Sequence, residues 1–268
     1  MLICCLLCLL TAEVVAQSAI VQTGARAMGM GRISACLSDV WAISNNVGAL
    51  VGTEYPSAGA TYHALPSFPA FNTMAAAFAL PWKTGVAGIG VFRFGDDLYN
   101  ESVASLGYAN RFGIASLGIK GNVIQCRAAD LETRSAVTVS FGGLATLTPG
   151  LLFGAYIVNV NQPVINPITE ERIITRLVAG IGIRPSPVFL ASAEIEKEVQ
   201  ERPILRAGAE YEVFHRMVFR TGFNFYPQSG YAGIGGKFGR LSLDYAIQLS
   251  EVFGLNHQAT ATCHFKRK

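Results

Sequence analysis

Residues 241–250 read Leu-Ser-Leu-Asp-Tyr-Ala-Ile-Gln-Leu-Ser, so apolar residues alternate with polar or small ones at every step. Successive side chains of a β-strand point to opposite faces, and this segment therefore predicts a strand with one apolar and one polar face. A strand in the wall of a transmembrane barrel has this pattern, because one face meets lipid and the other meets the lumen. The apolar face holds Leu241, Leu243, Tyr245, Ile247 and Leu249, and the polar face holds Ser242, Asp244, Ala246, Gln248 and Ser250.

Three further segments, 173–184, 204–213 and 217–225, alternate in the same way. One such segment is weak evidence, but its recurrence along the chain favours a barrel wall. The predicted lipid-facing residues include Leu177, Ile181, Ile183, Leu205, Tyr211, Met217, Phe219, Phe223 and Phe225.

From about Pro56 onward the chain predicts a series of strands separated by turns, with no helical period. Most are about 9–12 residues long, and a tilted transmembrane strand needs about 9–11. We therefore predict an all-β protein, a transmembrane antiparallel β-barrel of about 14 strands, whose boundaries are good to about two or three residues. The predicted strands are 57–63, 72–80, 85–95, 101–110, 114–126, 134–147, 151–159, 172–184, 188–196, 203–214, 216–226, 230–238, 241–250 and 256–266.

The predicted connections alternate between longer and shorter ones, as in outer-membrane barrels with long outer loops and short periplasmic turns. The sign of charge follows the same alternation, since the longer loops are mainly acidic and the short turns and the C-terminal tail are basic. The longest loop, Asn161–Glu171, contains Pro163 and Pro167. The longer set is Ala64–Phe71, Gly95–Asn100, Arg127–Thr133, Asn161–Glu171, Lys197–Arg202, Pro227–Ser229 and Glu251–Leu255.

The composition agrees with a membrane protein. Of the 268 residues only 15% are charged and 28 are glycine, whereas about a quarter of a soluble domain is charged. The net charge of +3 gives no strong attraction to nucleic acid. No apolar stretch reaches the ~18 residues of a transmembrane helix, so a closed barrel is the remaining way to cross a bilayer.

The first 17 residues predict a cleaved export signal, because Leu2–Leu10 is apolar and ends before small residues near Val14–Gln17. The predicted organisation is therefore a signal peptide at 1–17, an N-terminal plug at 18–55 and a transmembrane barrel at 56–268. After cleavage Cys36, Cys126 and Cys263 remain. Their spacing matches no zinc or redox motif, so we expect small buried apolar side chains.

Residues 24–50 read GARAMGMGRISACLSDVWAISNNVGAL and form the one stretch with the character of a motif. Ser38 and Asp39 precede Val40, Trp41 and Ile43 as a helix N-cap does. We expect a short helix or a turn-rich plug here.

In this stretch the chain resembles the PorV/PorQ-like members of the FadL-type outer-membrane protein superfamily. The resemblance implies a 14-stranded barrel with the N-terminus tucked into the lumen, and a role beside a type IX secretion system. One element departs from the family pattern, because Asn46 stands where relatives have proline and an extra residue separates Gly48 from Leu50. The resemblance rests on Ala25, Arg26, Met28, Gly29, Met30 and Gly31, then Ala35, Asp39 and Ala42, then Asn45, Asn46, Val47, Gly48, Ala49 and Leu50.

The predicted inner face of the C-terminal half is charged with both signs, which favours ion pairs across the lumen or docking of the plug over an ion-selective pore. We expect Arg26 and Asp39 to pair with these charges. In the early strands the predicted inner face is small and apolar (Ala87, Ile89, Val91, Val103, Ser105 and Gly107), which suits either a hydrophobic ligand or packing against the plug. The predicted lumen charges are Arg176, Arg184, Glu194, Glu196, Arg206, Glu210, Glu212, Arg220, Lys237 and Asp244.

The inventory of reactive residues argues against an enzyme. The four histidines lie near turns or strand ends without metal-ligand spacing, and no Gly-x-Ser-x-Gly motif is present. No cofactor and no metal site are predicted. The glycines at 24, 29 and 31 lack the Gly-Lys-Ser/Thr of a phosphate loop.

Three functions remain open for a multi-pass protein of the bacterial outer membrane. By resemblance it is a PorV/PorQ-like accessory of type IX secretion or surface assembly, with secretion-system proteins as partners. Alternatively it is a FadL-type channel for small hydrophobic compounds, or a structural protein whose partner is the outer-membrane lipid. A cargo-handling protein is expected to present a broad loop surface, and a transporter an apolar cavity with a break or kink in the wall.

Overall fold

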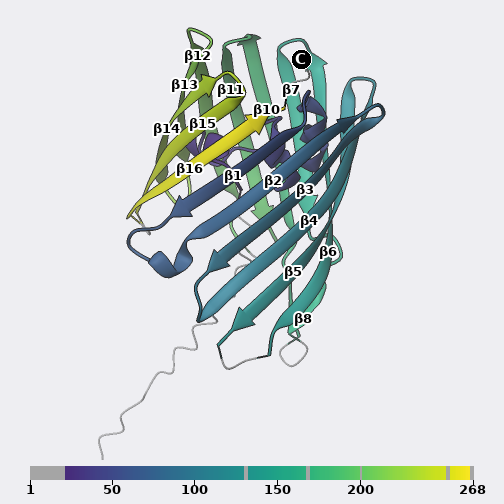
Figure 1. The fold of residues 1–268 in the computed structure, drawn as a ribbon, viewed down its shortest axis with the longest axis vertical. Helices are drawn as coiled ribbons and strands as arrows, with labels where there is room; N and C mark the ends of the chain where they lie inside the picture. Colours follow the sequence, from purple (N-terminus) through teal and green to yellow (C-terminus); the bar gives the residue numbers. More distant parts are fainter. Residues whose placement is uncertain (1–21, 130–131, 167–169, 200, 252–253, 266–268) are drawn as a thin grey trace, which may run out of the picture.

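The computed structural model describes residues 22–129, 132–166, 170–199, 201–251 and 254–265. Fourteen antiparallel strands close into one barrel (Figure 1), which confirms the predicted fold class and strand number. The predicted signal peptide lies outside the described residues. The barrel strands are β1 Ser57–Ala64, β2 Thr73–Trp82, β3 Gly85–Gly95, β4 Tyr99–Phe112, β5 Ala115–Ala128, β6 Arg134–Thr148, β7 Leu151–Val158, β10 Arg176–Ser186, β11 Phe189–Glu198, β12 Ile204–Val213, β13 Met217–Asn224, β14 Ser229–Phe238, β15 Leu241–Ser250 and β16 Gly254–His264.

The first and last strands close the barrel. β1 pairs with β16 over its whole length, from Ser57 opposite His264 to Ala64 opposite His257. On the inner side of this seam, the Thr61 and Thr260 hydroxyl oxygens are 2.7 Å apart. Closure leaves no unpaired strand edge, which is the condition for β structure in a bilayer. Ladder register shifts occur near two short turns, at Thr146–Thr148 and Ile183–Ser186.

The alternation of side chains places apolar residues outside and polar residues inside, as predicted. On β15, Leu243 and Tyr245 are exposed on the outer face, whereas Ala246 and Gln248 are buried inside. The long apolar side chains that a soluble protein would bury therefore cover the exterior, as expected for a wall in contact with lipid. The exposed set includes Leu177, Ile181, Ile183, Leu205, Tyr211, Met217, Phe219, Phe223, Phe225 and Leu249.

The prediction that Ala87, Ile89 and Val91 of β3 face the lumen is wrong. Ile89 and Val91 are 53% and 57% exposed on the outer face, and Gly88 and Gly90 face inward instead. A Cβ on Gly88 would lie 3.1–3.3 Å from Leu50 and Ile43, so the glycines leave room for apolar side chains inside the barrel. The parity of β4 is as predicted, since Val103, Ser105 and Gly107 pair with inward residues of β3.

The connections at the two ends of the barrel differ, as predicted. The short turns and the C-terminal end of β16 lie at the top of Figure 1, and the long loops lie at the bottom. Two short turns use a glycine with positive φ, Gly113 (61°) and Gly239 (63°), a conformation that glycine adopts without strain. In the long loops the structure adds the helical turn η3 (Pro69–Phe71) and the two-stranded hairpin β8 (Val164–Asn166) with β9 (Glu171–Arg172). The predicted strand at 172–184 therefore begins four residues late, at Arg176.

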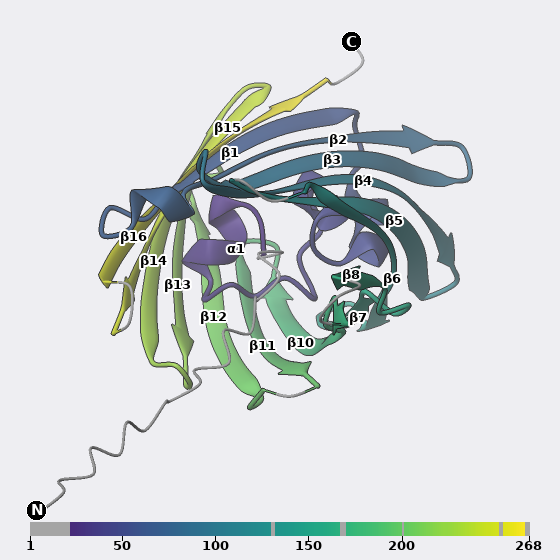
Figure 2. The ribbon, with the colours of Figure 1, turned by 90° about the horizontal axis from the view of Figure 1, so that it is seen from below.

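Residues 22–55 lie inside the ring of strands (Figure 2). We call residues 22–55 the inner segment. It contains one turn of α-helix, α1 (Ala25–Gly29), and two 3-10 helices, η1 (Val40–Ile43) and η2 (Val47–Gly52). Its largest apolar cluster packs on the small inward residues of β2 (Ala75, Ala77, Ala79). In the described part of the chain, no helix is long and apolar enough to cross a membrane.

Candidate functional site: the barrel lumen

The inner segment and the wall touch through backbone as well as side chains. A Cβ on Gly154, Gly208 or Gly222 of the wall would overlap the backbone of the inner segment at Ala35, Met30 or Gly31, in that order. Glycine allows such close approach because it has no side chain. These three wall glycines therefore form a track along which the inner segment lies directly on β7, β12 and β13.

A chain of ion pairs joins α1 to the wall. Arg26 donates from Nε (2.9 Å) and Nη2 (2.7 Å) to the two oxygens of Glu210, a bidentate contact. Its Nη1 lies 3.2 Å from the Asp39 carboxylate. Glu210 also accepts from Arg220 Nε at 2.7 Å, and Arg220 Nη1 lies 2.7 Å from Asp244. Arg26 thus meets a wall charge, whereas Asp39 meets Arg26 within the inner segment and accepts from the Trp41 amide as the N-cap of η1.

A second polar cluster holds the middle of the inner segment. Glu194 Oε2 accepts from the backbone amides of Ser34 (2.8 Å) and Ala35 (2.7 Å). The same carboxylate lies 3.2 Å from Arg206, which also binds Glu196 at 2.8 Å. These charges are almost fully buried, so their mutual pairing offsets the cost of removing them from water.

The remaining lumen charges predicted from the sequence lie at the edges of these clusters. Arg176 is 3.9 Å from Glu196. Lys237 binds Glu212 at 2.7 Å near the short turns, and Arg184 is exposed at the same end of the barrel. Most of the predicted lumen charges therefore meet in the two buried clusters, whereas Glu212, Lys237 and Arg184 lie apart at the short-turn rim.

Two important contacts are absent from the sequence predictions. Lys120 of β5 donates from Nζ to the carbonyl oxygens of Ile43 (2.9 Å) and Ser44 (2.8 Å), at the end of η1. Asn46 donates to Ala35 O (2.7 Å) and Gly143 O (2.9 Å), and accepts from the Gly48 amide. Two features of the sequence could have pointed to these contacts. One is a lysine, Lys120, at an inward-facing position of an otherwise apolar strand, and the other is Asn46 where relatives have proline.

The motif glycines and Asn45 also have defined positions. Gly29 packs on Gly233, since a Cβ on either would lie 3.1 Å from the Cα of the other. Gly31 has a positive φ of 77°. Asn45 exchanges two 3.0 Å hydrogen bonds with the Thr23 backbone. Ala25, Met28 and Met30 are buried, and Gly48 lies against Gly142 and Gly143 of β6. The motif residues are thus distributed along contacts with β6, β7 and β12–β16.

Two chambers flank the inner segment. The larger, about 930 Å³, lies at the short-turn end and is bordered by Arg26, Asp39 and Trp41 of the segment. The smaller, about 320 Å³, lies at the outer-loop end and is bordered by Gln22 and Arg32. The inner segment therefore supplies part of the wall of both chambers.

The outer end of the lumen also has an apolar wall. Val103, Ile124 and Ala136 of β4–β6 form a buried cluster with Ile173, and Ile165 packs against it. Ile165 lies within the longest predicted outer loop and Ile173 just after it, so this part of the chain turns into the mouth instead of presenting only an exposed surface. The apolar surface of β4–β6 beneath the β8–β9 hairpin is therefore covered by these two isoleucines.

Cys36, Cys126 and Cys263 are free thiols. The prediction that all three are buried holds for Cys36, whereas Cys126 and Cys263 are only partly buried. Cys36 is buried, and burial raises the pKa of its thiol to about 11, with the Glu194 carboxylate adding to the shift. At neutral pH the thiol is therefore protonated and unreactive. Among the described residues, no group of three histidine, cysteine or acidic side chains is placed to hold a metal ion.

No protein-family model matches the sequence, and no curated protein matches it. Solved structures match in fold. The Ralstonia pickettii toluene transporter TbuX has a TM-score of 0.70 at 12% identity, over 92% of this chain and 99% of that chain. The P. putida toluene transporter TodX has a TM-score of 0.71 at 11% identity, over 93% and 100%. A Pseudomonas aeruginosa FadL homologue has a TM-score of 0.68 at 11% identity, over 91% and 98%.

The closed wall, its apolar exterior and these likenesses define the class of protein: an outer-membrane β-barrel with the FadL-type fold. The apolar exterior of the closed wall is that of a barrel whose strands cross a membrane. Two of these structures are described as toluene transporters and the third as a FadL homologue. The finer PorV/PorQ resemblance has no counterpart among them.

Proposed function

We propose that this protein is a channel for small hydrophobic molecules, which pass through the lumen when the inner segment moves. The proposal favours the second of the three functions left open by the sequence. Its main support is the fold shared with two toluene transporters across nearly the whole of each chain. At 11–12% identity this likeness concerns the fold, so the substrate class comes from those proteins by analogy.

The lumen supports the same proposal. A hydrophobic molecule arriving from outside would first meet the apolar cluster of β4–β6, now covered by Ile165 and Ile173. Further passage requires the inner segment to shift, because it lies between the two chambers. Its polar contacts with Glu194, Glu210 and Lys120 stabilise the closed position of the inner segment. Each of these buried charges would lose its partner if the segment moved, and it would then need a new one.

The test is uptake of a labelled monoaromatic hydrocarbon by bacterial cells with a lipopolysaccharide outer leaflet, with and without this protein. We expect faster uptake with the protein and no added permeability to a hydrophilic sugar of similar size. Equal uptake in the two strains, or faster entry of the sugar, would contradict the proposal. A variant that lacks residues 22–55 controls for the barrel alone and is expected to admit both solutes.

A second candidate, an accessory role in type IX secretion or surface assembly, rests on the motif residues between Ala25 and Leu50. The test is a pull-down of tagged protein from native outer membranes with mass spectrometry. Recovery of a large secretion barrel or surface-bound cargo would favour this role. Recovery of the barrel alone with a co-purified fatty acid or other apolar compound would favour the channel.

A further inference from the structure

The lipid-facing side of the barrel carries a groove of about 1400 Å³ that crosses the strands. The ladder register defines its floor as one row of outward residues, in which Ala76 of β2, Ala60 of β1 and Ala261 of β16 are direct neighbours. Val91 of β3 and Leu243 of β15 continue this row on either side. Because alanine has only a methyl side chain, the three adjacent alanines form the floor of a groove between the longer side chains on either side.

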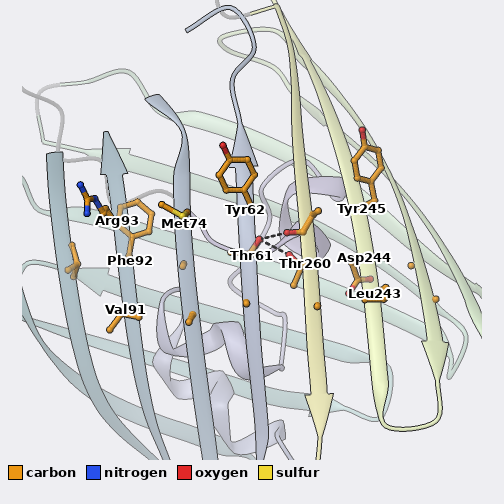
Figure 3. Close-up of a pocket in the computed structure, with 18 of the residues that line it drawn as sticks. Thr61, Tyr62, Met74, Val91, Phe92, Arg93, Leu243, Asp244, Tyr245 and Thr260 are labelled. Carbon is orange, nitrogen blue, oxygen red and sulfur yellow. Dashed lines mark hydrogen bonds between the residues drawn. The ribbon is translucent and has the colours of Figure 1, made fainter. Parts of the chain in front are cut away.

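A second row forms the wall of the groove toward the outer loops. By register, Arg93, Met74 and Tyr62 are neighbours on β3, β2 and β1, and the row continues through Ala259 to Tyr245. Figure 3 shows Arg93, Met74, Tyr62 and Tyr245 of this row on their strands, with the Thr61–Thr260 contact at the seam between β1 and β16. The continuous β1–β16 ladder closes the wall at this seam, so the two rows of outward residues line the groove on the exterior of the barrel.

Arg93 supplies an unbalanced positive charge at this wall. It is exposed on the outer face, two residues before the outer end of β3. Within the described ranges, its guanidinium has no carboxylate or hydrogen-bond partner. An arginine on the lipid face is unfavourable unless it reaches the interface, and a phosphate is its natural bidentate partner there.

Tyr62 adds a donor to the same row. Its hydroxyl oxygen accepts from Asn72 Nδ2 at 2.9 Å, so its own O–H can donate to another oxygen. Two strand spacings separate Tyr62 from Arg93, about 10 Å, which suits two oxygen groups of one lipid head group. The two polar groups stand on the outer-loop side of the floor.

We propose that this groove binds one phosphorylated lipid of the outer leaflet, with its phosphate on Arg93 and an acyl chain across Ala76, Ala60 and Ala261. Charge complementarity at Arg93 selects an anionic lipid, and the apolar floor selects its acyl chain. The site would fix the barrel's height and orientation in the outer leaflet. It is independent of the proposed transport, because it lies on the opposite side of the wall from the lumen.

The test is native mass spectrometry of the full-length protein in detergent, with purified lipid A as the added probe. Wild type is expected to retain one lipid A, and Arg93→Gln to weaken retention about tenfold, as loss of a charge-assisted contact predicts. Arg127→Gln is the matched control, because Arg127 is exposed toward the outer end of β5 but lies outside the groove. Equal retention by these two variants would overturn the phosphate contact.

The acyl-chain contact is tested by Ala76→Phe, which fills the floor, with Ala232→Phe on the exterior of β14 as its control. Heat-modifiable mobility on gels verifies that both variants fold. Ala76→Phe is expected to lose lipid A and Ala232→Phe to retain it. If both retain it, the groove does not hold the acyl chain and the proposal is wrong.

Discussion

Gly222 of β13 is a position where one methyl group decides a contact between inner segment and wall. A Cβ there would overlap the backbone of Met30 and Gly31. We predict that Gly222→Ala destabilises the folded protein by about 1–3 kcal/mol, as overpacking does. Thermal unfolding in detergent measures this. Gly230→Ala on β14, where a Cβ would meet nothing within 4 Å, is expected to be neutral, and an equal loss in both variants would refute the close approach.

Arg26 and Asp39 contribute unequally to the ion-pair chain. Removing Arg26 leaves Arg220 as the ion-pair partner of Glu210, and these charges are largely buried. We predict that Arg26→Ala costs about 2–3 kcal/mol, somewhat less than breaking a fully buried pair. Asp39→Asn keeps an acceptor for the Trp41 amide, so it is expected to cost under about 1 kcal/mol. Chemical denaturation in detergent would show the ranking, and a larger effect of Asp39→Asn would contradict it.

At this scale the sequence predicts which charges face inward, because alternation on β11–β15 determines it. The inward orientation of Glu194, Arg206 and Glu210 is predicted by the alternation of side chains alone. Their partners are not, since Glu194 binds backbone amides some 160 residues earlier in the chain. Lys120 and Asn46 likewise bind carbonyl oxygens of remote segments, and no local pattern encodes such a contact.

The β8–β9 hairpin is the element that most affects access to the lumen. Ile173 beside it is buried against β4–β6, whereas Val164 is 38% exposed. We predict that Ile173→Ser removes about 2–4 kcal/mol of docking energy, more than a two-stranded hairpin can replace by itself. Trypsin cleavage after Arg172 is expected to accelerate in Ile173→Ser and to stay unchanged in Val164→Ser. Identical cleavage in both variants would show that the hairpin is not held by this contact.

Most strands are predictable as elements, because a period of two over about ten residues is incompatible with the 3.6-residue period of a helix. β3 shows the limit of that argument. Both faces of β3 consist of apolar residues or glycine, so hydrophobicity cannot show which face points into the lumen. The face that carries Gly88 and Gly90 points inward because only glycine leaves room there for Ile43 and Leu50. The hairpin in the longest loop is too short to carry a periodic signal.

For the whole molecule, the strand number and the alternation of long loops with short turns are sufficient to predict a closed barrel. The path of the inner segment across the lumen is not predictable in the same way, because it depends on glycines in strands far apart in sequence. The two chambers on either side of this segment exist only in the assembled barrel. The channel proposal depends on them, because a permeant would pass from one chamber to the other.

The central claim, that hydrophobic molecules cross the lumen only when the inner segment moves, is open to a covalent test. A Cβ on Gly182 of β10 would lie 3.2 Å from the Cβ of Cys36, close to the separation in a disulfide, about 3.5–4.5 Å. Gly182→Cys therefore offers a reversible link between the inner segment and the wall. Joining the two thiols removes two electrons and two protons, so an added oxidant is needed to form the bond. The raised pKa of the Cys36 thiol, about 11, keeps the thiolate fraction low and makes the reaction slower.

The measurement is uptake of a labelled monoaromatic hydrocarbon by cells that carry Gly182→Cys, after oxidation and again after reduction. Cys126 and Cys263 are replaced by alanine in every variant, and Gly182→Ser serves as the control. We predict that oxidation reduces uptake to the level of cells without the protein, that reduction restores it, and that Gly182→Ser responds to neither. Equal uptake by the oxidised, demonstrably cross-linked protein and the reduced protein would contradict a moving inner segment.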